Sequence, residues 1–199
     1  MTSFDASPTD AGVKAMLTWR SSDNSRLEQV RLNLNGSRVR AYGRIVAAAT
    51  DDSAAYSASY ELVTNDSGVT RRLSVRVLRA DGDSALDLSR DMDGRWMVQT
   101  PTSTVRSDFD GAEVVDLELS PFFKGLPVRR FGITPGVRRT DLPVVTLRLP
   151  DCEIDSLTKS YVGLADGRVE VIGPKGSKFL TVNDAGVVSD YSGIASLIG

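Results

Sequence analysis

The sequence predicts an all-β protein in which consecutive antiparallel strands form a strongly bent sheet, an open or closed barrel, or a sandwich. Three observations support this fold class. Apolar and polar residues alternate in many short segments, which is typical of half-buried strands. Turn signals such as Asn-Gly and Asp-Gly recur along the chain, and no long segment keeps a helical period. A chain of 199 residues, 41% of them hydrophobic, suits one domain with its own core.

This single domain is expected to cover residues 15–199. Residues 1–14 are mostly small and polar and predict a flexible N-terminal arm, although residues 13–19 could already lead into a first strand. The first residues lack the basic and apolar regions of a signal peptide, and no apolar run approaches the roughly 20 residues that cross a bilayer. Cys152 is alone and cannot form an internal disulfide. We therefore expect a cytoplasmic protein without stable membrane insertion.

The clearest hairpin lies near the start of the domain. Residues 27–34 alternate so that their apolar side chains share one face, and Asn35-Gly36 then leads into a second strand at 38–46. Further strands are expected at residues 56–63, 70–78, 85–88, 95–98, 112–119, 144–149, 160–164, 169–172, 177–182 and 187–191. The helical signals are weak: one turn at 156–160 and a short helix at 191–198.

Charge and composition exclude several classes of function. The formal net charge is −2 and the arginines alternate with apolar residues, so the chain lacks the basic surface of a nucleic-acid-binding protein. The absence of histidine excludes Ser-His-Asp and Cys-His catalysis and histidine-ligated metals. An enzyme would need carboxylates, Lys, Tyr or a cofactor. The acidic and glycine-containing turns complete neither a calcium loop nor a phosphate loop, so we expect no metal and no cofactor.

Residues 120–131 form the most unusual segment, with two prolines, three phenylalanines and the pair Arg129-Arg130. Because proline interrupts sheet pairing, we interpret the segment as a loop between strands. Its structural interpretation is a crossover whose Phe122 and Leu126 enter the core. Its functional interpretation is the rim of a ligand pocket. An inward-facing arginine would then need an anionic ligand or an acidic partner, for which the candidates are Glu28, Asp116 and Glu118.

Other candidate residues lie on the expected strands. Arg71-Arg72 is either a solvated strand face or a contact to an anionic head group. The aromatic residues suit the core of a curved sheet, and they also suit stacking on sugars or lining an acyl site. These aromatic residues are Trp19, Tyr42, Tyr60, Trp96 and Tyr161.

Several motifs, taken in order, resemble one known family. The run from Ser120-Pro121-Phe122 to Arg129-Arg130 resembles the signature "TPFTNTLPIRR" of the bacterial putative glycolipid-binding family, long known as a domain of unknown function. The other matching landmarks are Trp19, Glu28, Tyr60-Glu61-Leu62, Arg71-Arg72-Leu73, Gly94-Arg95-Trp96, Asp110-Gly111, Asp116, Tyr161, Phe179, Gly186-Val187-Val188 and Asp190-Tyr191. The resemblance covers roughly residues 15–195. Phe123-Lys124-Gly125 replaces "TNT" within the signature, which alters the side chains that could meet a ligand.

The resemblance implies a long antiparallel meander curled into a partly open barrel, similar to bacterial lipoprotein carriers. It implies non-catalytic binding of a lipid or glycolipid in the concave face, which requires a continuous apolar cavity of at least about 300 Å³. The candidate ligand-binding residues are Arg72, Arg129, Arg130, Glu28, Asp116, Trp96 and Tyr161. Two alternatives remain. One is an enzyme using Glu28 and Asp116 as paired carboxylates on a lipid or sugar, and the other is a protein-interaction module.

Overall fold

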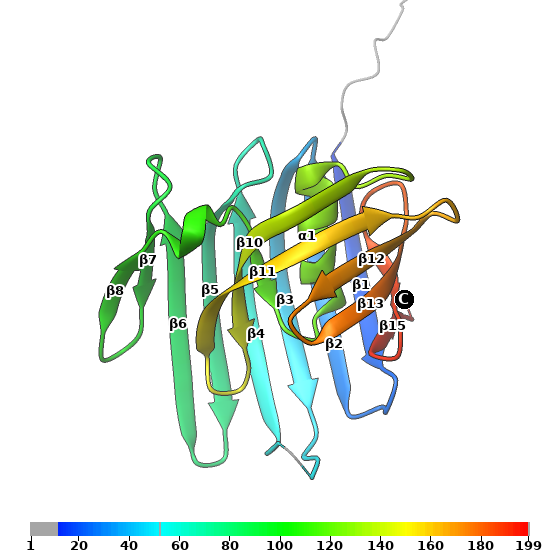
Figure 1. The fold of residues 1–199 in the computed structure, drawn as a ribbon. Coiled ribbons are helices and arrows are strands. Elements are labelled where there is room, and N and C mark those ends of the chain that lie inside the picture. The colour runs from blue at the N-terminus through cyan, green and yellow to red at the C-terminus, as the bar shows by residue number, and fades with distance from the viewer. Residues whose placement is uncertain (1–11, 52, 199) are drawn as a thin grey trace, which may run out of the picture.

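The computed structural model describes residues 12–51 and 53–198, which form one curled 15-stranded sheet, one α-helix and one 3-10 helix (Figure 1). Along the sheet the strands follow the order β8-β7-β6-β5-β4-β3-β2-β1-β15-β14-β13-β12-β11-β10-β9. The sheet therefore has two edges, β8 and β9, and is not closed. The predicted all-β class and the partly open barrel are confirmed.

Strands that follow one another in the chain are neighbours in the sheet, with the one exception of β8 and β9. Their bounds are β1 Val13–Ser21, β2 Arg26–Asn35, β3 Arg38–Ala47, β4 Tyr56–Thr64, β5 Thr70–Arg79, β6 Gly82–Arg90, β7 Trp96–Gln99, β8 Thr104–Ser107, η1 Phe109–Gly111, β9 Val115–Leu117, α1 Pro121–Phe131, β10 Arg138–Arg148, β11 Glu153–Gly163, β12 Arg168–Gly173, β13 Gly176–Val182, β14 Val188–Tyr191 and β15 Ala195–Leu197.

The hairpin of β2 and β3 shows how the alternation of residues along a strand determines which side chains the sheet buries. Every second residue of β2 is buried, and these residues face the interior. Asn35 pairs with Arg38, so the turn consists of Gly36 and Ser37, one residue later than the Asn-Gly signal suggests. Gly36 has a φ of 55°, which glycine adopts without steric cost. The predicted hairpin is confirmed, with its turn moved by one residue.

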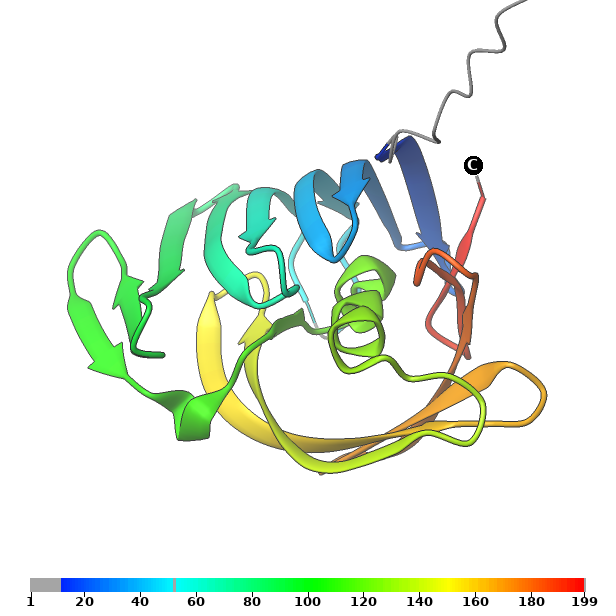
Figure 2. The ribbon, with the colours of Figure 1, turned by 90° about the horizontal axis from the view of Figure 1, so that it is seen from above.

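Seen from above, the molecule is an arch that surrounds a helix (Figure 2). Strands β1 to β8 form one wall, and β10 to β13 sweep across the opposite side, while α1 lies between the two walls (Figure 2). The C-terminal strand β15 returns to pair with β1, with Trp19 opposite Leu197. The concave space predicted from the sequence therefore exists, but a helix occupies it.

Helix α1 is the largest departure from the sequence prediction, which made residues 120–131 a loop. Ser120 caps the helix by accepting a hydrogen bond from the Phe123 amide, Pro121 begins it, and Gly132 ends it with a φ of 60°. Pro127 lies inside the helix, where it lacks an amide donor. Residues 121–128 are all buried, so tertiary packing outweighs this local cost. The prediction that Phe122 and Leu126 enter the core is confirmed.

Three smaller expectations are also corrected. Residues 156–160 belong to β11, and residues 191–198 contain the end of β14, a turn and β15, so neither is helical. Strand β9 pairs in parallel with β10, so the sheet is mixed and not wholly antiparallel. The expected arm at residues 1–14 lies mostly outside the described residues, and β1 already begins at Val13.

Candidate functional site

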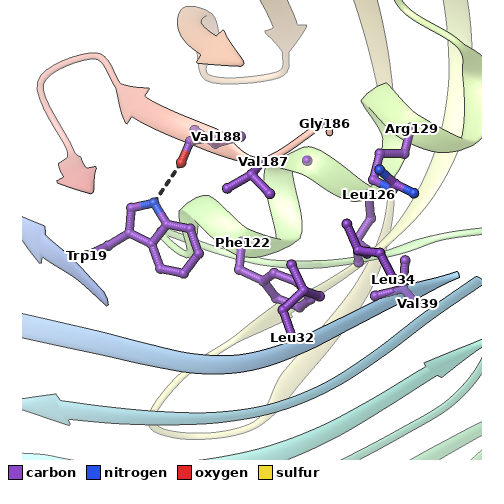
Figure 3. Close-up of a pocket in the computed structure, with 11 residues that line it drawn as sticks. Trp19, Leu32, Leu34, Val39, Phe122, Leu126, Arg129, Gly186, Val187 and Val188 are labelled. Carbon is purple, nitrogen blue, oxygen red and sulfur yellow. Dashed lines mark hydrogen bonds between the residues drawn. The ribbon is translucent and has the colours of Figure 1, made fainter. Parts of the chain in front are cut away.

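The space between α1 and the wall of β1 to β3 is filled with side chains (Figure 3). Phe122 and Leu126 of the helix pack toward Leu32, Leu34 and Val39, and the gap between them measures about 10 Å³. That volume is at the lower limit for a single water molecule. The continuous apolar cavity that we expected in the concave face is therefore absent from the described part of the chain, because α1 takes its place.

Two further contacts hold the C-terminal strands close to the helix. The indole nitrogen of Trp19 donates a hydrogen bond of 2.7 Å to the Val188 carbonyl, which ties β1 to β14 beside the helix (Figure 3). A Cβ atom on Gly125 would lie 2.5 Å from the Gly186 carbonyl oxygen, so this helix position fits only glycine at the observed approach.

Glu28 lies at the inner side of β2 in a closed polar cluster. The Tyr60 and Ser120 hydroxyls both donate to Glu28 Oε1, at 2.7 and 2.6 Å. The second carboxyl oxygen, Oε2, is buried and has no partner among the described residues. Burial raises the pKa of Glu28, and the hydrogen bonds from Ser120 and Tyr60 offset only part of that rise. The Glu28 carboxyl is thus enclosed by its neighbours, unlike an exposed catalytic carboxylate.

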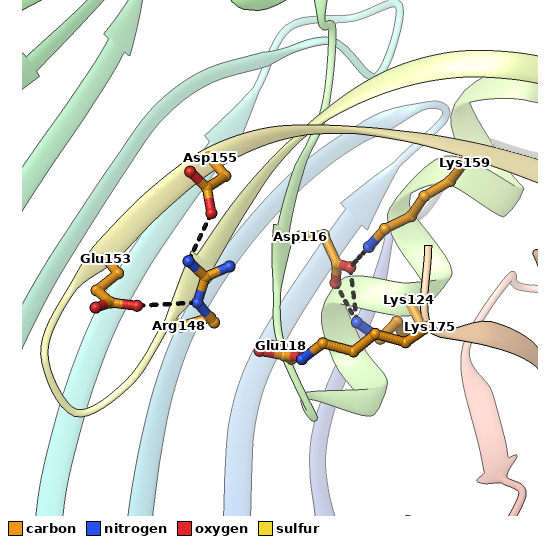
Figure 4. A network of polar contacts seen from close by, with 8 residues as sticks. All are labelled: Asp116, Glu118, Lys124, Arg148, Glu153, Asp155, Lys159 and Lys175. Carbon is orange, nitrogen blue, oxygen red and sulfur yellow. Dashed lines mark hydrogen bonds and ion pairs between the residues drawn. The ribbon is translucent and has the colours of Figure 1, made fainter. Parts of the chain in front are cut away.

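Asp116 lies on β9 at the centre of a buried ionic cluster (Figure 4). The Lys124 ammonium, from α1, contacts both carboxylate oxygens of Asp116 at 2.6 and 2.7 Å. The Lys159 ammonium, from β11, contacts Oδ2 of the same carboxylate. Burial alone would raise the pKa of Asp116, but the two lysines hold it below its ordinary value. Burial lowers the pKa of Lys124, and Asp116 opposes that change.

This ionic cluster forms part of the wall of a cavity of about 300 Å³, which we call the lysine cavity. Five of its lining side chains are basic and one is acidic: Lys124, Arg148, Lys159, Lys175, Lys178 and Glu118. Its apolar wall consists of Leu119, Leu157, Val171, Ile194 and the ring of Tyr191. The cavity thus combines positive charge with apolar surface, which suits a ligand that has an anionic end and a hydrocarbon part.

A second cavity of about 580 Å³ lies next to it, and Leu119 and Ile194 line both. We call it the serine cavity, after Ser21, Ser22, Ser25 and Ser53 in its wall. Arg26 also lines it and donates a hydrogen bond of 2.5 Å to the Leu119 carbonyl. The two cavities adjoin at their two shared residues, Leu119 and Ile194.

The predicted arginines do not converge on one site. Arg72 is exposed and lies on the opposite side of β5 from the fully buried Leu73, so it faces away from the concave interior. Arg129 donates to the carbonyls of Ala185 and Gly36, while Arg130 forms an ion pair of 2.9 Å with Glu113. The expected acidic partners are therefore wrong: neither Glu28 nor Asp116 pairs with an arginine, and Glu118 pairs with Lys175.

Four of the five aromatic candidates are core residues, whereas Tyr42 is 44% exposed on the outer side of β3, so the core expectation is wrong for Tyr42. Trp96 is fully buried and donates a hydrogen bond of 3.0 Å to the Ala112 carbonyl. Tyr161 is buried in the smaller of two hydrophobic clusters. Burial raises the pKa of Tyr161 well above its ordinary range, and nearby Asp116 adds to this. Tyr161 therefore lies near the ionic cluster, whereas Trp96 lies elsewhere in the sheet.

Comparison with known proteins assigns the chain to a family. A family model described as "Putative glycolipid-binding" matches residues 16–196, almost the whole domain. The chain belongs to this family. A crystal structure of a DUF1089 family protein from Pseudomonas aeruginosa is similar at 26% identity, with a TM-score of 0.71, and the match covers 96% of this chain and 98% of that one. No curated protein matches the chain.

Within this family, the signature segment of our chain forms α1 and its N-cap. Phe123-Lys124-Gly125, which departs from the family signature, supplies the buried ring of Phe123, the ammonium in the ionic cluster and the close contact to Gly186. The altered positions are therefore structural as well as part of the lysine cavity.

The cavity residues that the sequence analysis did not select as ligand contacts include Lys124, Lys159 and Thr146. Lys124 offered a signal, because it is a single charge within a run of apolar residues. Lys159 and Thr146 offered none, since they join the site through β11 and β10.

The described residues contain no group of three His, Cys, Asp or Glu side chains that could hold a metal ion. Likewise, no helix among them is long and apolar enough to cross a membrane.

Proposed function

We propose that the protein binds a lipid or glycolipid without transforming it, and that the ligand lies in the lysine and serine cavities at the rim of the arch. The observation that carries this proposal is the pair of adjoining cavities, of about 300 and 580 Å³, that share Leu119 and Ile194. These volumes lie within the usual range for small-molecule sites. The family description supports the ligand class.

Leu119 supports the position of the site. Its side chain is 45% exposed, although leucine is normally buried. Its backbone has a φ of 66°, a conformation that a leucine rarely adopts. Leu119 thus presents an apolar side chain at the junction of the two cavities, where an apolar part of a ligand could contact it. Each ligand methylene removed from water there would contribute about 0.8 kcal/mol.

The alternative function, an enzyme with paired carboxylates, would use Glu28 and Asp116. Both side chains lie in closed environments, which favours binding over catalysis. Glu28 is enclosed by Tyr60 and Ser120, and Asp116 is held by two lysines. Neither carboxyl combines access to a cleft with a free oxygen facing it, as paired-carboxylate hydrolysis requires.

The test is binding of single-chain amphiphiles below their micelle concentrations, measured by isothermal titration calorimetry. The probes are decyl maltoside, a neutral glycolipid analogue, and decyl phosphate, a charged one with the same chain. We expect at least one to bind the protein. Ile194→Glu should weaken that binding at least about tenfold, because it places a charge in the apolar part of both cavities.

The matched control is Leu78→Glu, the same change at an exposed apolar residue of β5. The backbone hydrogen bonds of Ile194, to Ser22 and Tyr191, do not depend on its side chain, so the variant should still fold. Unchanged binding by Ile194→Glu would place the ligand elsewhere. Binding of neither probe by the parent protein would refute the proposal and favour the interaction-module alternative.

A further inference from the structure

The ionic cluster around Asp116 carries more positive than negative charge. Asp116 is 1% exposed and Lys124 7%, and the Lys159 side chain is 11% exposed. One carboxylate is thus shared by two ammonium groups in a nearly dry environment. A buried charge without a counter-charge is costly, so the surplus positive charge calls for a further anion.

The neighbouring charged groups do not supply that anion. Glu118 lies close enough to oppose the lowering of the Lys124 pKa by burial, but its ion pair, at 2.7 Å, is with Lys175, whose side chain is largely exposed. The two carboxylates near Arg148, Glu153 and Asp155, both pair with that arginine (Figure 4).

The other titratable groups nearby do not neutralise the surplus positive charge either. Tyr191 lies under Lys124, with the ammonium 5.6 Å from the ring centre, and burial raises the pKa of Tyr191 to about 12, so it is neutral at pH 7. Glu28 is hydrogen-bonded to Tyr60 and Ser120 and has a raised pKa. Lys178 adds another positive charge and forms no ion pair within the described residues.

An independent observation at the same place is the hydroxyl of Thr146. This residue is 2% exposed, it lines the lysine cavity, and its Oγ1 has no hydrogen-bond partner among residues 12–51 and 53–198. Thr146 lies directly opposite Asp116 in the parallel pairing of β10 with β9. Buried hydroxyls are normally hydrogen-bonded, so an unpartnered one at a cavity wall suggests a missing acceptor.

We infer that the lysine cavity holds one negatively charged oxygen-rich group, such as a phosphate, sulfate or carboxylate, carried by the head group of the amphiphile. This inference rests on the proposed function and narrows its ligand to anionic lipids or glycolipids. Lys159 and Lys124 supply the charge, and the buried Thr146 hydroxyl would donate a hydrogen bond to an oxygen of the group once its side chain turns toward the cavity. The hydrocarbon part continues past Leu119 and Ile194 into the serine cavity.

The experiment compares decyl phosphate, decyl maltoside and inorganic phosphate at pH 7 by calorimetry. We expect decyl phosphate to bind at least about tenfold more tightly than either of the others. Lys159→Met should abolish most of this preference, because it removes one charge while the Asp116–Lys124 pair remains. Thr146→Val, which removes only the hydroxyl, should weaken decyl phosphate several-fold and leave decyl maltoside unchanged. Lys14→Met, the same change at an exposed lysine of β1, is the control and should have no effect.

The outcomes separate the two proposals. Equal binding of both decyl probes, unaffected by Lys159→Met, would overturn the anionic site while the binding function stands. Inorganic phosphate binding as tightly as decyl phosphate would show a site for a free oxyanion and overturn the head-group assignment. Binding of neither decyl probe would refute the proposed function itself. If Lys159→Met fails to fold, the Thr146→Val comparison decides the question alone.

Discussion

Asp116→Asn tests the ionic cluster that connects α1 to the sheet. The substitution keeps the shape of the side chain but removes the negative charge shared by Lys124 and Lys159. Both ammonium groups border the lysine cavity, and their side chains are only 8% and 11% exposed. The variant therefore leaves two nearly buried ammonium groups without the carboxylate that they share.

The expected cost is about 3–5 kcal/mol, the range measured when one partner of a buried ion pair is removed. This is a large share of the stability of a single domain. The double variant Asp116→Asn with Lys124→Met should recover at least about 1 kcal/mol relative to Asp116→Asn, because one nearly buried ammonium instead of two then lacks a partner. Recovery on removing a second native group is a result that simple loss of packing would not produce.

The measurement is urea unfolding followed by tryptophan fluorescence. Trp19 and Trp96 are both fully buried, and they lie in β1 and β7, so they report on separate parts of the sheet. A loss smaller than about 1 kcal/mol for Asp116→Asn would mean that the cluster is well solvated and would refute the reasoning. Additive losses in the double variant would show that the two groups are not coupled.

Three further predictions concern the interior. Phe123→Ala should cost about 3–5 kcal/mol in the free energy of unfolding, because Phe123 is fully buried with its ring 5.0 Å from that of Tyr60. Gly43→Ala should cost about 1–3 kcal/mol by thermal or urea unfolding, since a Cβ there would lie 2.0 Å from the Tyr60 ring. The pKa of Glu28 is raised in the folded protein. The contribution of Glu28 to the free energy of unfolding should therefore be largest below the ordinary pKa of 4.5, and it should be lost as the pH rises through the raised pKa. Glu28→Gln should remove this slope in unfolding curves measured from pH 4 to 8, and an unchanged slope would assign it to other groups.

The strands were predictable because their signals are local. The alternation of β2 follows from residues 26–35 alone, and its observed burial has the same period of two. The hairpin turn at Gly36 was located to within one residue. The alternation of residues could not predict how the sheet curves. The curvature depends on pairing between strands that are distant in the chain, such as β15 with β1.

Helix α1 was missed for a physical reason. A helix that is buried on nearly all sides shows no amphipathic period, and its two prolines argue against a helix interior. The end signals were nevertheless present in the sequence: Ser120 before Pro121, and Gly132 after a pair of arginines. Caps were thus more informative here than periodicity or propensity.

The candidate site could be predicted only in part. Asp116 was selected from the sequence, but the groups around it come from elements far away in the chain. Thr146 lies opposite Asp116 because β9 pairs in parallel with β10, and Lys159 follows on β11. The parallel pairing had no local signal, so its consequences for the cavity could not be derived from residue patterns.

The position of α1 also decides between an interior site and a rim site. An interior ligand would have to displace the helix, which means separating Gly125 from the Gly186 carbonyl, Lys124 from Asp116 and Arg129 from the Ala185 carbonyl. A ligand at the rim requires none of these changes. Because Lys124 belongs both to α1 and to the wall of the lysine cavity, an anion bound there would also favour the seated helix. Ligand binding at the rim should therefore stabilise the domain with the helix in place, whereas an interior ligand would bind more weakly by the free energy needed to displace the helix.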